Sequence, residues 1–207
     1  MSFNLLPLGE QFPALLAHLD TLTDENHPEE MRPSYLRKLV LEAHQRPDLP
    51  RDKICRWLGY SYGIIMARHP NLTQVFSFNE PKFDEDFSGH PIVRASVQVL
   101  GNLKAIMQGR QKITAHDGDL HDSHYIANNA HASNLIEKLI EDAIRDGNHI
   151  GVNALSLRVG LIQGYMISYY FLDVSEERNR TRPIFHKAYE ELGIRPPKSV
   201  AISKREG

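Results

Sequence analysis

Arginines near the C-terminus are the first residues whose types and spacing could support chemistry. Arg178, Arg180 and Arg182 follow one another at alternate positions, and His186 and Lys187 come soon after. Guanidinium groups bind phosphate or carboxylate in a forked geometry, and the backbone N–H groups at a helix N-terminus favour the same anions. The cluster predicts a site for a phosphate or for an acidic partner surface. Local ion pairing with neighbouring glutamates is the alternative.

Two apolar segments carry glycines four residues apart. Gly59 and Gly63 lie in the first segment, and Gly160 and Gly164 lie in the second. In a helix these glycines share one face and let a neighbouring helix come close, so helix packing is the main interpretation. A ligand lying over the bare backbone is the alternative.

Aromatic residues surround the same glycines. The tyrosines of the two segments are Tyr60, Tyr62, Tyr165, Tyr169 and Tyr170. Such rings have an apolar face and a polar tip, so they suit either a core or a ligand that stacks on them. If the two helices meet, we expect these rings, Trp57, Arg56 and the arginine cluster to line one pocket of nucleotide size.

Histidines and aspartates are densest between His116 and His124. Imidazole and carboxylate are ligands that transition metals accept, and His121 and His124 would share one helix face. We therefore consider a divalent metal held by His121, Asp122 and His124. A solvated polar loop that caps the next helix is the alternative interpretation.

The same region is similar to the HD-type metal phosphohydrolases, which are all helical. In these enzymes an upstream histidine, a His-Asp pair and a later aspartate hold the metal that activates water. His90, the pair His121-Asp122, and Asp146 or Asp173 stand in that order. The resemblance implies hydrolysis of a nucleotide.

Composition limits the class of protein. The 207 residues carry a net charge of −2 and are 41% apolar, which is ordinary for a globular chain and argues against strong binding to duplex nucleic acid. Cys55 is the single cysteine, and its apolar neighbours favour a buried structural thiol. No run approaches the ~20 apolar residues of a membrane span. We expect a cytoplasmic protein that does not enter a membrane.

Helical periodicity runs through nearly the whole chain and predicts an all-α protein, a compact bundle of about seven helices. Residues 71–89 are expected to form one long loop that contains aromatic residues. A single domain over residues 1–195 is the main interpretation, possible halves being 1–75 and 90–195, with a mobile basic tail at 196–207. The expected helices span residues 10–22, 33–45, 50–69, 91–110, 123 or 129 to 146, 152–172, and a last one that Thr181 caps and whose first turn contains Pro183.

Three stretches near the C-terminus carry a second resemblance. They are Val159–Gly164, Leu172–Arg178 and Thr181–Tyr189. Together they resemble a helical module of small accessory proteins from tailed phages and prophages. The resemblance implies a phage or prophage origin and carries no known activity. A small protein that acts on the host by binding is the kind of function it suggests.

Three functions follow in order of preference. The first is a phage-type accessory protein that binds and inhibits a host defence or regulatory protein in the host cytoplasm. The second is sequestration of a nucleotide signal molecule, and the third is HD-type phosphohydrolysis. We expect binding rather than catalysis and no cofactor apart from the divalent metal considered above. The sequence leaves the oligomeric state open, and a homo-oligomer is one alternative.

Overall fold

The computed structural model describes residues 8–22, 29–46, 48–68, 84–114 and 123–196. The regular structure of this part of the chain is all helical, with no strand, which confirms the all-α prediction. Seven α-helices and one 3-10 turn are described, and their bounds are α1 Leu8–Leu19, η1 Glu29–Met31, α2 Pro33–Gln45, α3 Arg51–Arg68, α4 Pro91–Thr114, α5 Ser123–Asp146, α6 Val152–Ser168 and α7 Val174–Glu191.

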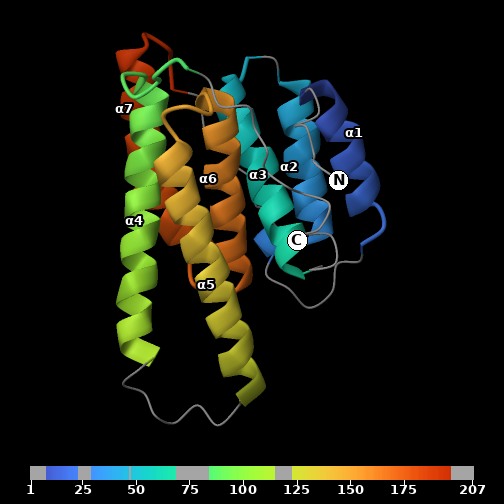
Figure 1. Ribbon diagram of the computed structural model, residues 1–207. Helices are drawn as coiled ribbons and strands as arrows, with labels where there is room; N and C mark the ends of the chain where they lie inside the picture. Colours follow the sequence, from blue (N-terminus) through green and yellow to red (C-terminus); the bar gives the residue numbers. More distant parts are fainter. Residues whose placement is uncertain (1–7, 23–28, 47, 69–83, 115–122, 197–207) are drawn as a thin grey trace.

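Helices α3 and α6 form the centre of the bundle (Figure 1). On one side α2 packs against α3, and α1 packs against α2; on the other side α4 and α5 pack against α6. Helix α7 packs against α4. The central position of α6 follows from its sequence, because it is apolar on nearly every side, and from Leu155 to Ile162 every residue except the half-buried Arg158 is buried.

Backbone lies against backbone where α3 meets α6. A methyl group added at Gly59 would stand 2.0 Å from the carbonyl oxygen of Leu157, and one added at Gly160 would stand 2.0 Å from the carbonyl oxygen of Arg56. Gly63 and Gly164 approach the partner backbone in the same way. The expectation that these glycines allow close helix packing is confirmed.

The two glycine helices run in the same direction. Gly59 lies beside Leu157 and Leu161, and Gly63 lies beside Leu161 and Gly164, so residue numbers rise together along both helices. The contacts are also reciprocal, since each helix offers a glycine to a carbonyl of the other. The similarity that the sequence shows between these two segments therefore corresponds to similar packing.

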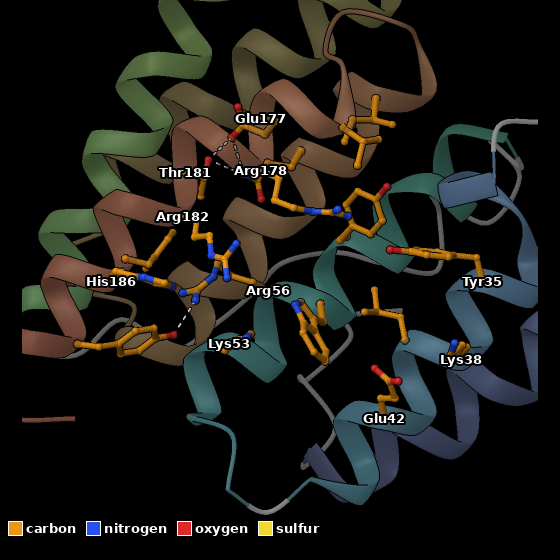
Figure 2. A pocket seen from close by; sticks show the side chains of 18 residues that line it. Tyr35, Lys38, Glu42, Lys53, Arg56, Glu177, Arg178, Thr181, Arg182 and His186 are labelled. Atoms are coloured by element: carbon orange, nitrogen blue, oxygen red, sulfur yellow. Dashed lines mark hydrogen bonds between the residues drawn. The ribbon is translucent and has the colours of Figure 1, made fainter. Parts of the chain in front are cut away.

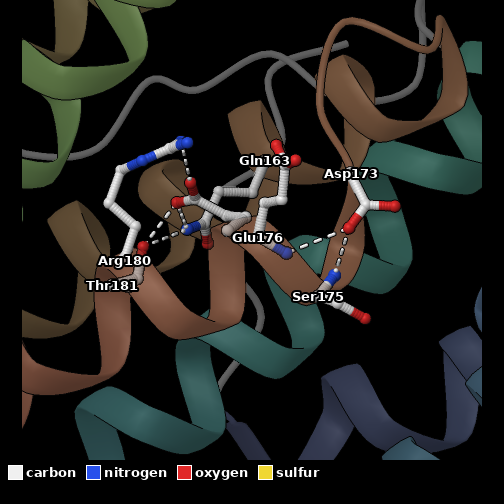
Figure 3. Close-up of polar contacts among 7 residues, drawn as sticks. Gln163, Asp173, Ser175, Glu176, Arg180 and Thr181 are labelled. Atoms are coloured by element: carbon white, nitrogen blue, oxygen red, sulfur yellow. Dashed lines mark hydrogen bonds and ion pairs between the residues drawn. The ribbon is translucent and has the colours of Figure 1, made fainter.

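The prediction that Thr181 caps the last helix is wrong. Helix α7 begins at Val174, and Asp173 caps it (Figure 3). Its carboxylate accepts hydrogen bonds from the backbone N–H groups of Ser175 and Glu176 at 2.8 and 2.9 Å. An aspartate at this position satisfies donors that have no partner within the helix, so the helix starts there.

Pro183 consequently lies inside α7 rather than in its first turn, and Pro13 lies inside α1. An interior proline removes one backbone hydrogen bond of the helix. Both prolines are exposed. Helix α7 nevertheless continues from Val174 to Glu191.

Helix α6 ends at Ser168, short of the Leu172 that the periodicity predicts. Tyr170 adopts a φ of 59°, and the following N–H group of Phe171 donates to the carbonyl oxygen of Met166 at 2.8 Å. This is the left-handed turn with which many helices end. The apolar pattern continues beyond the turn because Leu172 is itself buried.

Some expectations fall outside the described residues. They include most of the 71–89 aromatic loop and residues 197–207 of the basic tail. The other helix boundaries lie within a few residues of the expected ones, and α4 extends to Thr114 rather than ending near residue 110.

Candidate functional site

A cavity of about 500 Å³ lies between α2, α3 and α7, and Gln163 and Ile167 of α6 complete its wall. We call it the α2–α3–α7 cavity (Figure 2). Its size falls within the range of small-molecule sites. It depends on the close contact between α3 and α6, because that contact sets the position of the α3 wall.

Basic side chains dominate the charged lining of the cavity. Helix α7 contributes Arg178, Arg182 and His186, which are four residues apart and therefore lie on one helix face. Helix α3 contributes Lys53 and Arg56. The continuity of α7 is what brings its three residues into line.

Aromatic rings form much of the remaining wall. Tyr35 comes from α2, Trp57 and Tyr60 come from α3, and Phe185 and Tyr189 come from α7. Burial raises the pKa of the Tyr35 and Tyr60 phenols, so both stay protonated at neutral pH and keep a donor. The cavity therefore offers flat apolar faces beside its cationic groups.

Arg56 is held by a buried network. Its guanidinium donates to Asp52 at 2.6 Å and to the hydroxyl of Tyr189 at 2.7 Å, and the Tyr189 hydroxyl donates to the same Asp52 oxygen at 2.7 Å. The guanidinium also lies 3.5 Å from the ring centre of Phe185. Burial is the main cause that raises the pKa of Tyr189. The network fixes Arg56 in the cavity wall.

A second network surrounds Glu177, which is 4% exposed. Figure 3 labels its partners Gln163, Arg180 and Thr181. One carboxylate oxygen accepts from the Thr181 hydroxyl and, at 2.7 Å, from the Gln163 amide. The other oxygen accepts from Arg180 at 3.0 Å. The carboxylate has donors on both oxygens, so it links α6 to α7 and does not need a ligand.

Positive charges crowd one another in the cavity. Burial, followed by the neighbouring cations Arg56, Arg46 and Arg182, lowers the pKa of Lys53 to about 8. Burial also lowers the pKa of His186, with Arg182 and Lys53 adding to the effect. The Lys53 ammonium lies over the Trp57 ring, 5.0 Å from its centre. An anion placed here would relieve the repulsion between these cations.

The structure brings together five of the eight binding residues that the sequence suggested. Arg56, Tyr60, Arg178, Arg182 and His186 all line the α2–α3–α7 cavity. The glycine helices meet, and of the rings on them that the sequence suggested, Trp57 and Tyr60 line the cavity with part of the basic cluster, whereas Tyr62, Tyr165, Tyr169 and Tyr170 do not.

The other three suggested residues have different positions. Arg180 forms an ion pair with Glu177 at 3.0 Å, and Lys187 is exposed and does not line the cavity. Tyr165 is buried in the core, where its ring stacks against that of Tyr169 with the centres 6.5 Å apart.

Sequence reasoning did not suggest many of the lining residues, among them Tyr35, Lys38, Glu42 and Lys53. Lys53 stands at helical spacing from Arg56 and Tyr60, so that pattern already places it on the same face of α3. No such spacing predicts that α2 lines the cavity, because the position of α2 depends on tertiary packing.

The suggested metal ligands His121 and Asp122 lie outside the described residues, as does the side chain of His124. Elsewhere in the chain, His90 accepts a hydrogen bond from the backbone of Ile92 at the start of α4. Within the described residues no group of three or more His, Cys, Asp or Glu side chains is arranged to hold a metal ion.

Asp146 and Asp173, the later aspartates of the HD-type order, have structural contacts of their own. Asp146 is buried and pairs with Arg145 at 3.2 Å and Arg158 at 3.7 Å, while Asp173 caps α7. Cys55 is buried as expected, and burial raises the pKa of its thiol to about 12. A thiol with so high a pKa is a poor nucleophile.

Comparison with known proteins gives no relative. No family model matches the chain, and neither a curated protein nor a solved structure is similar to it. The resemblances to the phage module and to the HD-type enzymes stay predictions. Among the described helices, none is both long and apolar enough to span a membrane.

Proposed function

We propose that this protein binds a small phosphorylated ligand, a nucleotide, in the α2–α3–α7 cavity. The observation that carries the proposal is the gathering of Lys53, Arg56, Arg178, Arg182 and His186 around one cavity that also has aromatic walls. Arginine forks recognise phosphate oxygens, and bases stack on aromatic faces. A cavity of about 500 Å³ has room for such a ligand.

Electrostatics supports an anionic ligand. Only two acidic side chains line the described cavity, and one of them, Glu177, is already paired with Arg180. Asp52 and Glu190 offset only part of the effect that burial and the neighbouring cations have on the pKa values of Lys53 and His186. A phosphate group supplies further negative charge and accepts several hydrogen bonds at once.

A nucleotide panel tests the proposal. Thermal shift and titration calorimetry would compare nucleoside mono- and diphosphates with inorganic diphosphate for the wild type, Arg182→Ala and Lys187→Ala. Loss of a charge-assisted hydrogen bond costs about 1.5–3 kcal/mol, so we expect Arg182→Ala to raise the Kd at least about tenfold. Lys187→Ala removes an exposed charge from the same helix outside the cavity, and its Kd should match that of the wild type.

Two results would contradict the proposal. One is the absence of binding by every nucleotide in the panel, and the other is an unchanged Kd for Arg182→Ala. The same samples separate sequestration from hydrolysis, because chromatography of the recovered nucleotide shows whether it is intact. We expect it to be intact, in keeping with sequestration of a nucleotide signal. Hydrolysis that disappears in His121→Ala and Asp122→Ala would instead support the HD-type alternative.

A further inference from the structure

The α2–α3–α7 cavity has two chemically different ends. In Figure 2 Arg182 and His186 stand on the α7 side, with Arg56 and Lys53 of α3 next to them. Lys38 and Glu42 of α2 stand on the opposite side. A phosphorylated ligand that places its phosphates among the basic groups must therefore direct its other end toward α2.

The two carboxylates of the cavity differ in whether protein groups already donate hydrogen bonds to their oxygens. Glu177 accepts hydrogen bonds on both oxygens from protein donors. Glu42 is half-buried and accepts no hydrogen bond from the residues that the structure describes. A carboxylate is an acceptor only, so Glu42 presents two oxygens to N–H donors of a ligand.

Lys38 precedes Glu42 by one helical turn, so both side chains project from one face of α2. The α2 wall thus offers a donor next to a pair of acceptors. Guanine has the complementary edge, a carbonyl oxygen followed by two adjacent N–H donors. Adenine and cytosine each offer one amino group followed by a ring acceptor, so they leave one Glu42 oxygen unpaired.

We propose that the α2 wall makes the cavity selective for guanine nucleotides, with Glu42 accepting from the two N–H donors of the base and Lys38 donating to its carbonyl oxygen. Tyr35 and Trp57 also line the cavity and provide faces for stacking. This inference rests on the proposed nucleotide binding and adds the identity of the base. A site built to bond polar groups rejects analogues that lack them, so the selectivity should be measurable.

The test keeps the phosphates constant and changes only the base. Titration calorimetry would compare GDP, IDP and ADP, since IDP lacks only the exocyclic amino group of guanine. The wild type should bind GDP at least about tenfold more tightly than IDP or ADP, because the latter two form fewer charge-assisted bonds. Glu42→Gln keeps the side-chain size and replaces one acceptor by a donor. This variant should raise the Kd of GDP about tenfold or more and leave the Kd of ADP within about twofold of the wild-type value.

Glu190→Gln is the matched control, since Glu190 is an exposed carboxylate of α7 that does not line the cavity. It should keep the wild-type order of the three ligands. Equal binding of GDP, IDP and ADP, with no response to Glu42→Gln, would overturn the guanine proposal and leave nucleotide binding intact. A failure of all three diphosphates to bind would overturn both.

Discussion

At the scale of single residues, Arg56 has fixed surroundings before any ligand arrives. Asp52 and Tyr189 bond its guanidinium from two directions, and Phe185 covers one face. A side chain that is already ordered loses little conformational freedom on binding. Lys53 differs, because its ammonium lies over a ring face and its charge depends on pH.

Lys53 should make ligand binding depend on pH. Its pKa of about 8 means that the ammonium is charged below pH 8 and neutral above it in the unliganded protein. A phosphate favours the charged form, so affinity is full below pH 8 and falls as the pH rises through this value. We expect the Kd for a nucleoside diphosphate to rise about threefold to tenfold between pH 7 and pH 9.5, measured by calorimetry.

The other titratable groups of the cavity should contribute little to the change in Kd between pH 7 and pH 9.5. The lowered pKa of His186 leaves it neutral throughout, and raised pKa values keep Tyr35 and Tyr60 protonated. Lys53→Arg is the control, because arginine stays charged and should flatten the profile. A wild-type Kd that is constant from pH 7 to 9.5 would show that Lys53 does not meet the phosphate.

Part of the cavity could be predicted from residue types. Arg182 and His186 share a spacing that fits one helix face, and Arg56 stands beside a tryptophan, so anion binding was a reasonable hypothesis. Glu42 could not be found in this way, because a single glutamate in an amphipathic helix is usually a solvated surface residue. Its place in the lining arises only when α2 packs beside α3.

At the scale of elements, the α3–α6 pair sets the geometry of the cavity. The two backbones approach so closely that a methyl group at Gly160 would collide with the Arg56 carbonyl group. Backbone atoms cannot move aside as a flexible side chain can. The position of Arg56 in the cavity therefore depends on a glycine in another helix.

Gly160→Ala should destabilise the protein by forcing α3 and α6 apart. Overpacking of this kind typically costs 1–3 kcal/mol, and we expect a loss of about 2–3 kcal/mol in the free energy of unfolding. Urea denaturation followed by circular dichroism measures it. The variant should also bind nucleotide more weakly, because Arg56 moves with α3.

Gly101→Ala is the matched control for this prediction. Gly101 lies inside α4 and is exposed, and an added methyl group would meet nothing within 4 Å. Alanine has a higher helix propensity than glycine, so the free energy of unfolding of this variant should be about 0.5–1 kcal/mol higher than that of the wild type. If Gly160→Ala were as stable as the wild type, the close contact between the helices would not be essential.

Most elements were predictable, and the errors have physical causes. Apolar periodicity indicates α2 and α5 well because each buries one face. The start of α7 was misplaced because Thr181 and Pro183 together imitate a helix N-terminus, whereas Asp173 provides the actual cap. Local signals of this kind compete, and tertiary burial of Glu177 beside Gln163 favours the longer helix.

At the scale of the whole molecule, the α2–α3–α7 cavity is built from helices that lie far apart in the sequence. Helices α2 and α3 precede the undescribed residues 69–83, and α6 and α7 follow them. The 1–75 and 90–195 halves considered from the sequence therefore share their largest interface and one cavity. Each half contributes a face of the α3–α6 contact that is apolar and buried only in the whole molecule.

Unfolding should therefore occur as one cooperative transition. Trp57 is the only tryptophan, and it lines the cavity on α3, so its fluorescence reports the junction between the halves. Far-ultraviolet circular dichroism reports all the helices together. Because neither half can keep its side of the α3–α6 contact buried alone, we expect the two probes to give coincident urea transitions. Loss of the tryptophan signal at a lower urea concentration than the helical signal would show that the halves separate first and that the chain contains two folding units.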